Sequence, residues 1–177
     1  MKGHYYLGCP VWACERWKGR LYTAQAPRDQ WLPQYAQVFG TVEGNSVFYH
    51  LPTLETVLRW LDSVPAGFRF ALKFPRVITH EKRLLKTQAE TRAFLELLEP
   101  LHVNERLGTC WLQLPPGFAP HHLADLQAYL DQLPRHLSFA VELRHPEFFR
   151  SPQIAQQLNE ILETRAINRV ILDSRPL

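Results

Sequence analysis

The chain has 177 residues, of which 46% are apolar, 12% aromatic and 21% charged. This composition excludes a disordered or coiled-coil protein, and the chain is long enough to bury a core. Its 20 Lys and Arg against 17 Asp and Glu give a formal charge of +3, a surplus too small to indicate nucleic-acid binding by itself.

The cysteines and the apolar runs indicate a reducing, aqueous environment. Cys9, Cys14 and Cys110 are odd in number and unevenly spaced, as expected of free thiols. No apolar run approaches the ~20 residues of a membrane span, and the first residues lack a signal-peptide core. We therefore expect a soluble, cytoplasmic protein without a membrane partner.

Short apolar runs alternate with amphipathic stretches along the chain. The runs are four to seven residues long and rich in β-branched or aromatic side chains, which predicts buried strands. In chain order the predicted strands are Tyr5–Cys9, Thr41–Asn45, Phe68–Lys73, Gly108–Leu114, Leu137–Glu142 and Arg169–Leu172.

The stretches between these runs have helical spacing, as in Leu123, Leu126 and Leu130. A capping box at Thr87 and an N-cap at Ser151 predict two helix starts. Strands that alternate with helices predict an α/β fold with a parallel sheet.

We expect this fold to be a single domain over residues 1–177, because no linker interrupts the pattern. The alternation alone fits either an open doubly wound sheet or a TIM-barrel-like sheet. A closed eight-stranded barrel needs about 250 residues, so a barrel of this length would be incomplete, with about six strands.

Polar side chains follow every predicted strand from the second onward. The carboxyl ends of parallel strands share one rim, where ligands of α/β folds bind. Charges next to buried segments are costly unless they pair with each other or with a ligand. The pattern therefore predicts either a structural ion-pair network or a pocket for an anionic or polyhydroxylated ligand.

In the pocket interpretation, Glu142 is the first choice for a general base or metal ligand, and Glu43 is the second. Lys73 and Arg144 are predicted to hold negative charge on the ligand. The other predicted ligand-binding residues are Asn45, Gln113, His80, His145, Asp173, Trp12 and Tyr49.

The sequence does not identify a metal or a cofactor. Donors suited to zinc or manganese are present, but without diagnostic spacing; they are Glu43, His80, Glu142, His145 and Asp173. A glycine-rich phosphate loop and a nucleophile elbow are both missing from the sequence, which disfavours dinucleotide-dependent and serine-hydrolase chemistry.

Four ordered motifs carry a resemblance to a known family. They are Thr41–Pro52, Phe70–Pro75 with Ile78–His80, Leu112–Pro116 and Val141–His145. Together they resemble the YecE-like family, domain of unknown function 72, over essentially the whole chain. The resemblance implies a TIM-barrel-like α/β fold and no settled reaction.

Two features depart from the family pattern. The turn after the first strand reads Gly8-Cys9-Pro10-Val11-Trp12, where the family usually has Gly-Thr-Ser-Gly-Trp. Family members also continue through two further strands, whereas this chain stops at Leu177. We therefore expect exposed edges at the first and sixth strands, and either self-association or an inactive fragment.

The leading functional hypothesis is a barrel that binds a small anionic or sugar-containing molecule, with hydrolytic or isomerase-like acid–base chemistry. The alternative is a nucleic-acid-binding or metal-dependent nuclease-like barrel. That alternative would use the basic residues Arg16, Lys18, Arg20, Lys82, Arg83 and Lys86. The sequence does not decide whether the protein is an enzyme.

Overall fold

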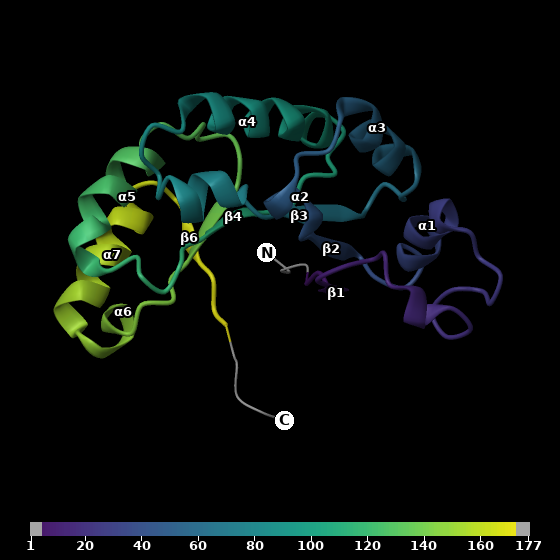
Figure 1. Ribbon diagram of the computed structural model, residues 1–177, viewed down its shortest axis with the longest axis horizontal. Coiled ribbons are helices and arrows are strands. Elements are labelled where there is room, and N and C mark those ends of the chain that lie inside the picture. Colours follow the sequence, from purple (N-terminus) through teal and green to yellow (C-terminus); the bar gives the residue numbers. More distant parts are fainter. Residues whose placement is uncertain (1–4, 173–177) are drawn as a thin grey trace. The chain divides into compact units, whose positions relative to one another are not determined.

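The computed structural model describes residues 5–172 and contains two compact units. Unit 1 comprises the chain up to Lys73 together with Ala93–Gly108, and unit 2 comprises Phe74–Arg92 together with the chain from Thr109 onward. Helix α4, Gln88–Val103, contributes residues to both units (Figure 1). The expectation of a single domain stays a prediction.

Unit 1 is built on a parallel sheet in the order β1-β2-β3. Its strands are β1 Gly8–Cys9, β2 Thr41–Gly44 and β3 Arg69–Leu72. Its helices are η1 Glu15–Trp17, η2 Arg28–Gln30, α1 Trp31–Tyr35, α2 Ser46–Tyr49 and α3 Leu54–Asp62. Each connection between neighbouring strands therefore runs through helix, as parallel pairing requires.

The core of unit 1 lies between this sheet and its helices. Val42, Phe70 and Leu72 are fully buried on adjacent strands. Tyr35 of α1 is also fully buried, and its hydroxyl donates to the Thr41 carbonyl at 2.9 Å. Burial raises the pKa of the Tyr35 phenol to about 12.

Close strand approach explains the glycine at the start of β1. A Cβ on Gly8 would collide with the Thr41 carbonyl of β2. The backbone N–H of the next residue, Cys9, donates to the Tyr35 hydroxyl at 2.6 Å. The short strand β1 is therefore fixed by a backbone contact on one side and a buried phenol on the other.

Unit 2 repeats the parallel pattern in the order β4-β5-β6. Its strands are β4 Cys110–Gln113, β5 Phe139–Glu142 and β6 Asn168–Arg169. Its helices are the π-helical turn η3 Val77–Glu81, η4 Pro120–His122, α5 Leu123–Leu130, α6 Glu147–Arg150 and α7 Pro152–Glu163. Strand β5 is buried along its whole length.

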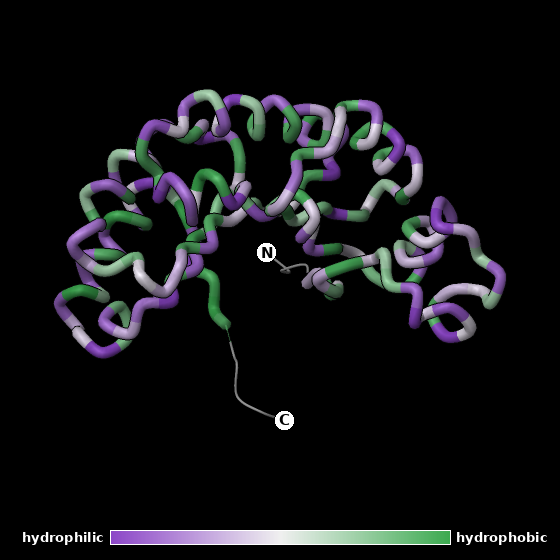
Figure 2. Tube along the Cα trace, viewed as in Figure 1, coloured by the Kyte–Doolittle hydropathy of each residue, from purple (hydrophilic) through white to green (hydrophobic). Residues whose placement is uncertain are grey.

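Both predicted helix starts agree with the structure. Helix α4 begins at Gln88, directly after Thr87. Helix α7 begins at Pro152, and the Ser151 hydroxyl accepts a hydrogen bond from the Ile154 N–H at 3.4 Å. Hydrophilic and hydrophobic residues alternate along α3 and α4 (Figure 2), as amphipathic helices require.

An observed strand lies within or overlaps each of the predicted ones, and all strand pairs are parallel. This confirms the α/β class with parallel strands. The outer strands are shorter than predicted: β1 lacks Tyr5–Leu7, and β6 is displaced to Asn168–Arg169. Each outer strand has one neighbour only: β1 begins opposite Thr41, the first residue of β2, and β6 pairs with only two residues of β5.

The strands between residues 5 and 172 form two three-stranded sheets, with no closed barrel among them. Ile171 and Leu172 follow β6 with 93% and 61% of their surface exposed. Self-association through such edges stays a prediction. No helix within the described residues is long and apolar enough to cross a membrane.

Candidate functional site

The ends of β2 and β3 bring Glu43 and Lys73 together in unit 1. Glu43 lies opposite Ala71 in the parallel register, and Lys73 lies two residues beyond Ala71 and so projects to the same face. The Lys73 Nζ is 3.0 Å from Glu43 Oε1, with 11% of the lysine and 31% of the glutamate side chain exposed. The lysine is the buried partner, and the carboxylate is the accessible one.

A cavity of about 100 Å³ adjoins this carboxylate. The loop after β1 forms one wall, and Glu43, Asn45 and Ser46 form the other. The Asn45 amide Nδ2 donates to the Pro10 carbonyl at 2.9 Å and so ties the two walls together. Asn45 therefore shapes the cavity as well as lining it.

The ends of β4 and β5 bring a second polar cluster together in unit 2. Gln113 and Glu142 are directly opposite in the register, and Gln113 Nε2 lies 2.9 and 3.0 Å from the two carboxylate oxygens. The Arg144 Nε donates to Glu142 Oε1 at 2.7 Å. Only 6% of the Glu142 side chain is exposed, against 39% of the Arg144 side chain.

This arrangement suits Glu142 to holding the Arg144 side chain in place more than to proton transfer. Its two oxygens already accept three hydrogen bonds from side chains and face little solvent. The Arg144 terminal guanidinium nitrogens make no hydrogen bond with any residue between 5 and 172. A guanidinium held by its Nε leaves these N–H groups to bind an anion.

The two predicted histidines make local contacts. His145 Nδ1 accepts a hydrogen bond from the Glu147 backbone N–H at 3.3 Å, at the start of α6. His80 lies in η3, where its Nδ1 is 2.9 Å from the Thr79 hydroxyl oxygen. Both contacts orient the ring without assigning it a chemical role.

Of the remaining predicted residues, Trp12 lines the cavity beside Glu43, and Tyr49 does not. Trp12 packs edge-to-face against Trp60, with ring centroids 5.3 Å apart. Tyr49 is 65% exposed and lies edge-to-face against Phe48 at 5.0 Å. Asp173 lies outside the described residues. Among the residues described, no group of three His, Cys, Asp or Glu could hold a metal ion.

The loop after η3 has a conformation that the sequence does not indicate. Arg83, Leu84 and Lys86 have φ angles of 48°, 71° and 52°, which non-glycine residues seldom adopt. The Leu84 side chain is buried, and the Lys82 Nζ binds both the Lys86 carbonyl and Glu90 Oε1, the latter at 2.6 Å. These contacts hold the strained backbone in place.

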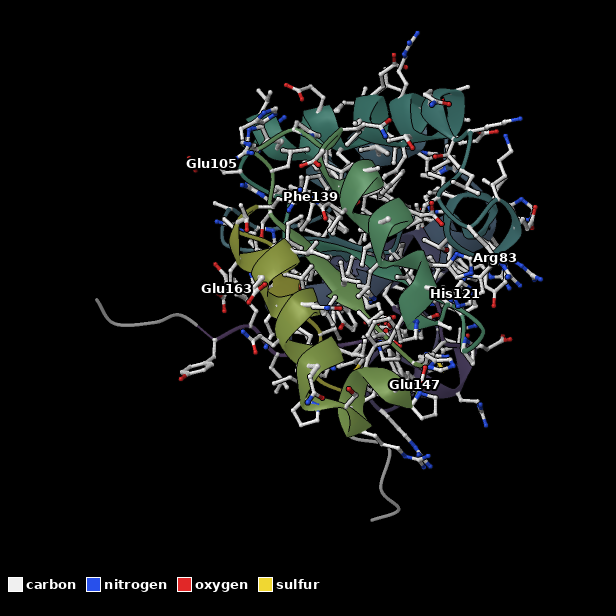
Figure 3. The ribbon with its side chains drawn as sticks, turned by 90° about the vertical axis from the view of Figure 1, so that its left-hand side faces the viewer. Arg83, Glu105, His121, Phe139, Glu147 and Glu163 are labelled. Carbon is white, nitrogen blue, oxygen red and sulfur yellow. The ribbon has the colours of Figure 1, made fainter. Side chains whose placement is uncertain are left out.

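The same loop directs Arg83 outward. Its guanidinium lies beside Gly117, 4.0 Å from the position that a Cβ would take there. Figure 3 shows Arg83 at the right-hand edge of the view. Hydrogen bonding to Lys82 lowers the pKa of the Glu90 carboxyl, which keeps the supporting ion pair charged.

The chain matches one family model, described as "Protein of unknown function DUF72", over residues 6–176. It is 41% identical over 172 residues to the UPF0759 protein YecE of Escherichia coli strain K12. That match covers 97% of this chain and 60% of the relative. This chain belongs to the DUF72 family.

Solved DUF72 structures have the same fold. A DUF72 protein from Thermotoga maritima superposes with a TM-score of 0.74 at 27% identity, covering 95% of this chain and 64% of that one. A DUF72 protein from Enterococcus faecalis superposes with a TM-score of 0.70 at 23% identity, covering 97% and 64%. The present DUF72 chain thus spans about three fifths of the length of these relatives.

Proposed function

We propose that this DUF72 chain binds a small anionic or sugar-containing molecule at the carboxyl ends of its parallel strands. The observation that carries the proposal is the pair formed by Glu142 and Arg144. A nearly buried carboxylate holds the guanidinium by its Nε, at 2.7 Å, while 39% of the arginine side chain stays exposed. An anionic group would complete the coordination of this guanidinium.

The strand ends of unit 1 form a second candidate site of their own, for a sugar-containing molecule. Glu43, Asn45 and Ser46 line a cavity of about 100 Å³, and their oxygen and nitrogen atoms suit ligand hydroxyl groups. In this unit 1 site Glu43 is the acid–base group for hydrolytic or isomerase-like chemistry. It is more exposed than Glu142, and the Lys73 ammonium lies 3.0 Å away, where it stabilises the carboxylate.

We also infer a TIM-barrel-like fold and a cytoplasmic location. The parallel strand order, the helical crossovers and the DUF72 relatives support the fold. None of Cys9, Cys14 and Cys110, all within the described residues, is in a disulfide, which supports a reducing compartment.

Calorimetric titration with glucose 6-phosphate, glucose and inorganic phosphate tests the proposal. Arg144→Gln should weaken the binding of glucose 6-phosphate by about tenfold, because it removes a charge-assisted contact. Arg150→Gln, which changes an exposed arginine of the same unit, is the matched control and should bind like the unchanged protein. Circular dichroism checks that both variants are folded.

Two results would contradict the proposal. One is the absence of heat with every probe at millimolar concentration. The other is equal affinity for glucose 6-phosphate in the unchanged protein and in folded Arg144→Gln. Loss of folding in Arg144→Gln would instead favour the structural ion-pair network, and Arg144→Lys then serves as the milder variant.

The strained loop after η3 favours a second candidate, the binding of a nucleic acid. Arg83 and Lys86 are exposed, and Arg83 makes no ion pair within the described residues. Binding of a single-stranded oligonucleotide should then fall steeply with salt and weaken in Arg83→Gln. A flat salt dependence would contradict this candidate without affecting the small-molecule proposal.

A further inference from the structure

Unit 1 contains a second and larger cavity, on the other side of Trp12. Its volume is about 350 Å³, against about 100 Å³ for the cavity beside Glu43. It is lined by the loop after β1, by η2 and the start of α1, and by helix α3. This volume falls within the range of roughly 300–1,000 Å³ that is typical of small-molecule sites. Trp12 lines both cavities, and the other lining residues differ.

Two indole rings form a corner in this cavity. The rings of Trp12 and Trp60 are 5.3 Å apart and meet at 84°. Trp60 also stacks on Phe70, with ring centroids 5.7 Å apart. The buried Leu32 side chain adds apolar surface to the cavity wall. Half-buried indole rings at right angles can take up a third aromatic ring by stacking or by edge-to-face contact.

The position of Trp12 is fixed by hydrogen bonds to its loop. The Tyr22 hydroxyl donates to the Trp12 carbonyl, and the Asn45 amide donates to the Pro10 carbonyl two residues earlier. The indole corner is therefore formed before any ligand arrives, which lowers the entropic cost of binding.

Four charged side chains surround the aromatic corner. Arg28 and Asp29 come from η2, and Arg59 and Asp62 from α3. The Arg59 Nη2 donates to the Thr56 hydroxyl at 3.1 Å, and the Arg28 guanidinium lies 5.7 Å from the Trp31 ring centroid.

These charges do not neutralise one another in pairs. All four are exposed, and none forms an ion pair with any residue from 5 to 172, although cations and anions line the same cavity in equal number. A ligand with a single charge would satisfy only one of these two sets. A ligand with both charges would satisfy both.

We propose that this cavity binds a small aromatic zwitterion of the chemical class of a free aromatic amino acid. The ring lies against Trp12 and Trp60, Arg59 pairs with the carboxylate, and Asp62 pairs with the ammonium group. The cavity, at about 350 Å³, is large enough for a molecule of this size. Apart from Trp12 the site shares no lining residue with the cavity beside Glu43, and it shares none with the Glu142–Arg144 pair, so either proposal can fail without the other.

Tryptophan fluorescence provides a direct test with three probes of similar shape. L-Phenylalanine carries both charges, 3-phenylpropionate only the carboxylate, and phenethylamine only the ammonium. Excitation at the red edge of the indole band avoids absorption by the probes. L-Phenylalanine should change the emission saturably and bind about tenfold more tightly than either singly charged probe, because each lost ionic contact weakens binding.

Substitutions at the two charged positions complete the test. Arg59→Gln and Asp62→Asn should each weaken L-phenylalanine binding about tenfold, and Arg59→Gln should leave the affinity for phenethylamine unchanged. Arg20→Gln, an exposed arginine of unit 1 away from the cavity, is the matched control and should have no effect.

The proposal is overturned if L-phenylalanine does not perturb the emission at millimolar concentration. It is also overturned if 3-phenylpropionate binds as tightly as L-phenylalanine, or if Arg59→Gln and Asp62→Asn both retain full affinity. Failure of glucose 6-phosphate to bind would leave these results unaffected, because that probe tests Arg144.

Discussion

The two units present opposite charges at the ends of sheets that have the same parallel topology. In unit 1 the lysine of the Lys73–Glu43 pair is 11% exposed and the glutamate 31%. In unit 2 the glutamate of the Glu142–Arg144 pair is 6% exposed and the arginine 39%. One unit therefore presents a carboxylate to solvent, and the other presents a guanidinium.

The reversal follows from how each glutamate is enclosed, because both glutamates lie within a strand and both cations lie just past one. Glu142 is the last residue of β5, directly opposite Gln113 of β4, so it is enclosed by the ladder. Arg144 lies two residues past the strand and reaches back to it. In unit 1 the glutamate lies within the ladder, but the cavity beside it keeps it accessible. Which charged group a strand end presents to solvent thus depends on how the side chain is enclosed as well as on the residue type.

The largest effect that distinguishes the two units is expected from Arg144→Ala. It removes the ionic partner of a carboxylate that has little access to water, so the free energy of unfolding should fall by about 2 kcal/mol. This value is below that of a fully buried pair because Arg144 is partly exposed. Urea unfolding monitored by fluorescence and circular dichroism measures it.

A double-mutant cycle shows whether the loss comes from the pair. Glu142→Gln removes the charge that Arg144 neutralises, so Arg144→Ala should cost less in that background. Equal costs in both backgrounds would mean that the two side chains are not coupled in the folded protein.

A smaller effect is expected from Glu43→Gln in unit 1. The amide oxygen still accepts a hydrogen bond from Lys73, and water can reach this more exposed side chain. The free energy of unfolding should fall by about 1 kcal/mol or less. Thr53→Ala, which removes the N-cap of α3 in the same unit, provides a reference loss of about 1 kcal/mol. A loss from Glu43→Gln larger than that from Arg144→Ala would contradict the comparison.

The smallest effect at neutral pH concerns two of the buried phenols, one chosen from each unit. Burial raises the pKa of Tyr35 to about 12, and burial also raises that of Tyr129, whose hydroxyl is 2.9 Å from that of Thr91. The folded protein keeps these protons where the unfolded chain loses them, near pH ~10. Their contribution to stability is therefore complete below about pH 10 and is lost as the pH rises toward 12.

Spectrophotometric titration of the phenolate band checks this expectation. Tyr129→Phe should remove absorbance that develops only well above pH ~10, and it should leave the earlier part of the curve unchanged. Loss of absorbance near pH ~10 instead would mean that Tyr129 ionises like an exposed phenol.

Much of the fold followed from local patterns. All six strand positions could be predicted because buried parallel strands are short apolar runs, and the starts of α4 and α7 because capping residues act on their own backbone. The lengths of β1 and β6 could not be predicted, since the extent of an edge strand depends on its pairing with a single neighbour. The strained loop at Arg83–Lys86 gave no signal, because it is Leu84 burial and the Lys82 contacts that impose it.

The candidate sites were likewise predictable only in part. The pairing of Gln113 with Glu142 was predictable from strand-end position, and so was that of Glu43 with Lys73, because parallel strands bring their carboxyl ends to one side of a sheet. The cavity between Trp12 and Trp60 was not predictable. Its residues lie in three segments that only the packing of α1 and α3 brings together.

The sequence by itself thus determined the DUF72 family, the α/β class and which polar residues end the strands, because each depends on residue type and local order. The tertiary structure decided which member of each ion pair is accessible and where unpaired charges meet half-buried indoles. Accessibility is a property of the surroundings of a side chain, and those surroundings come from segments distant in the chain.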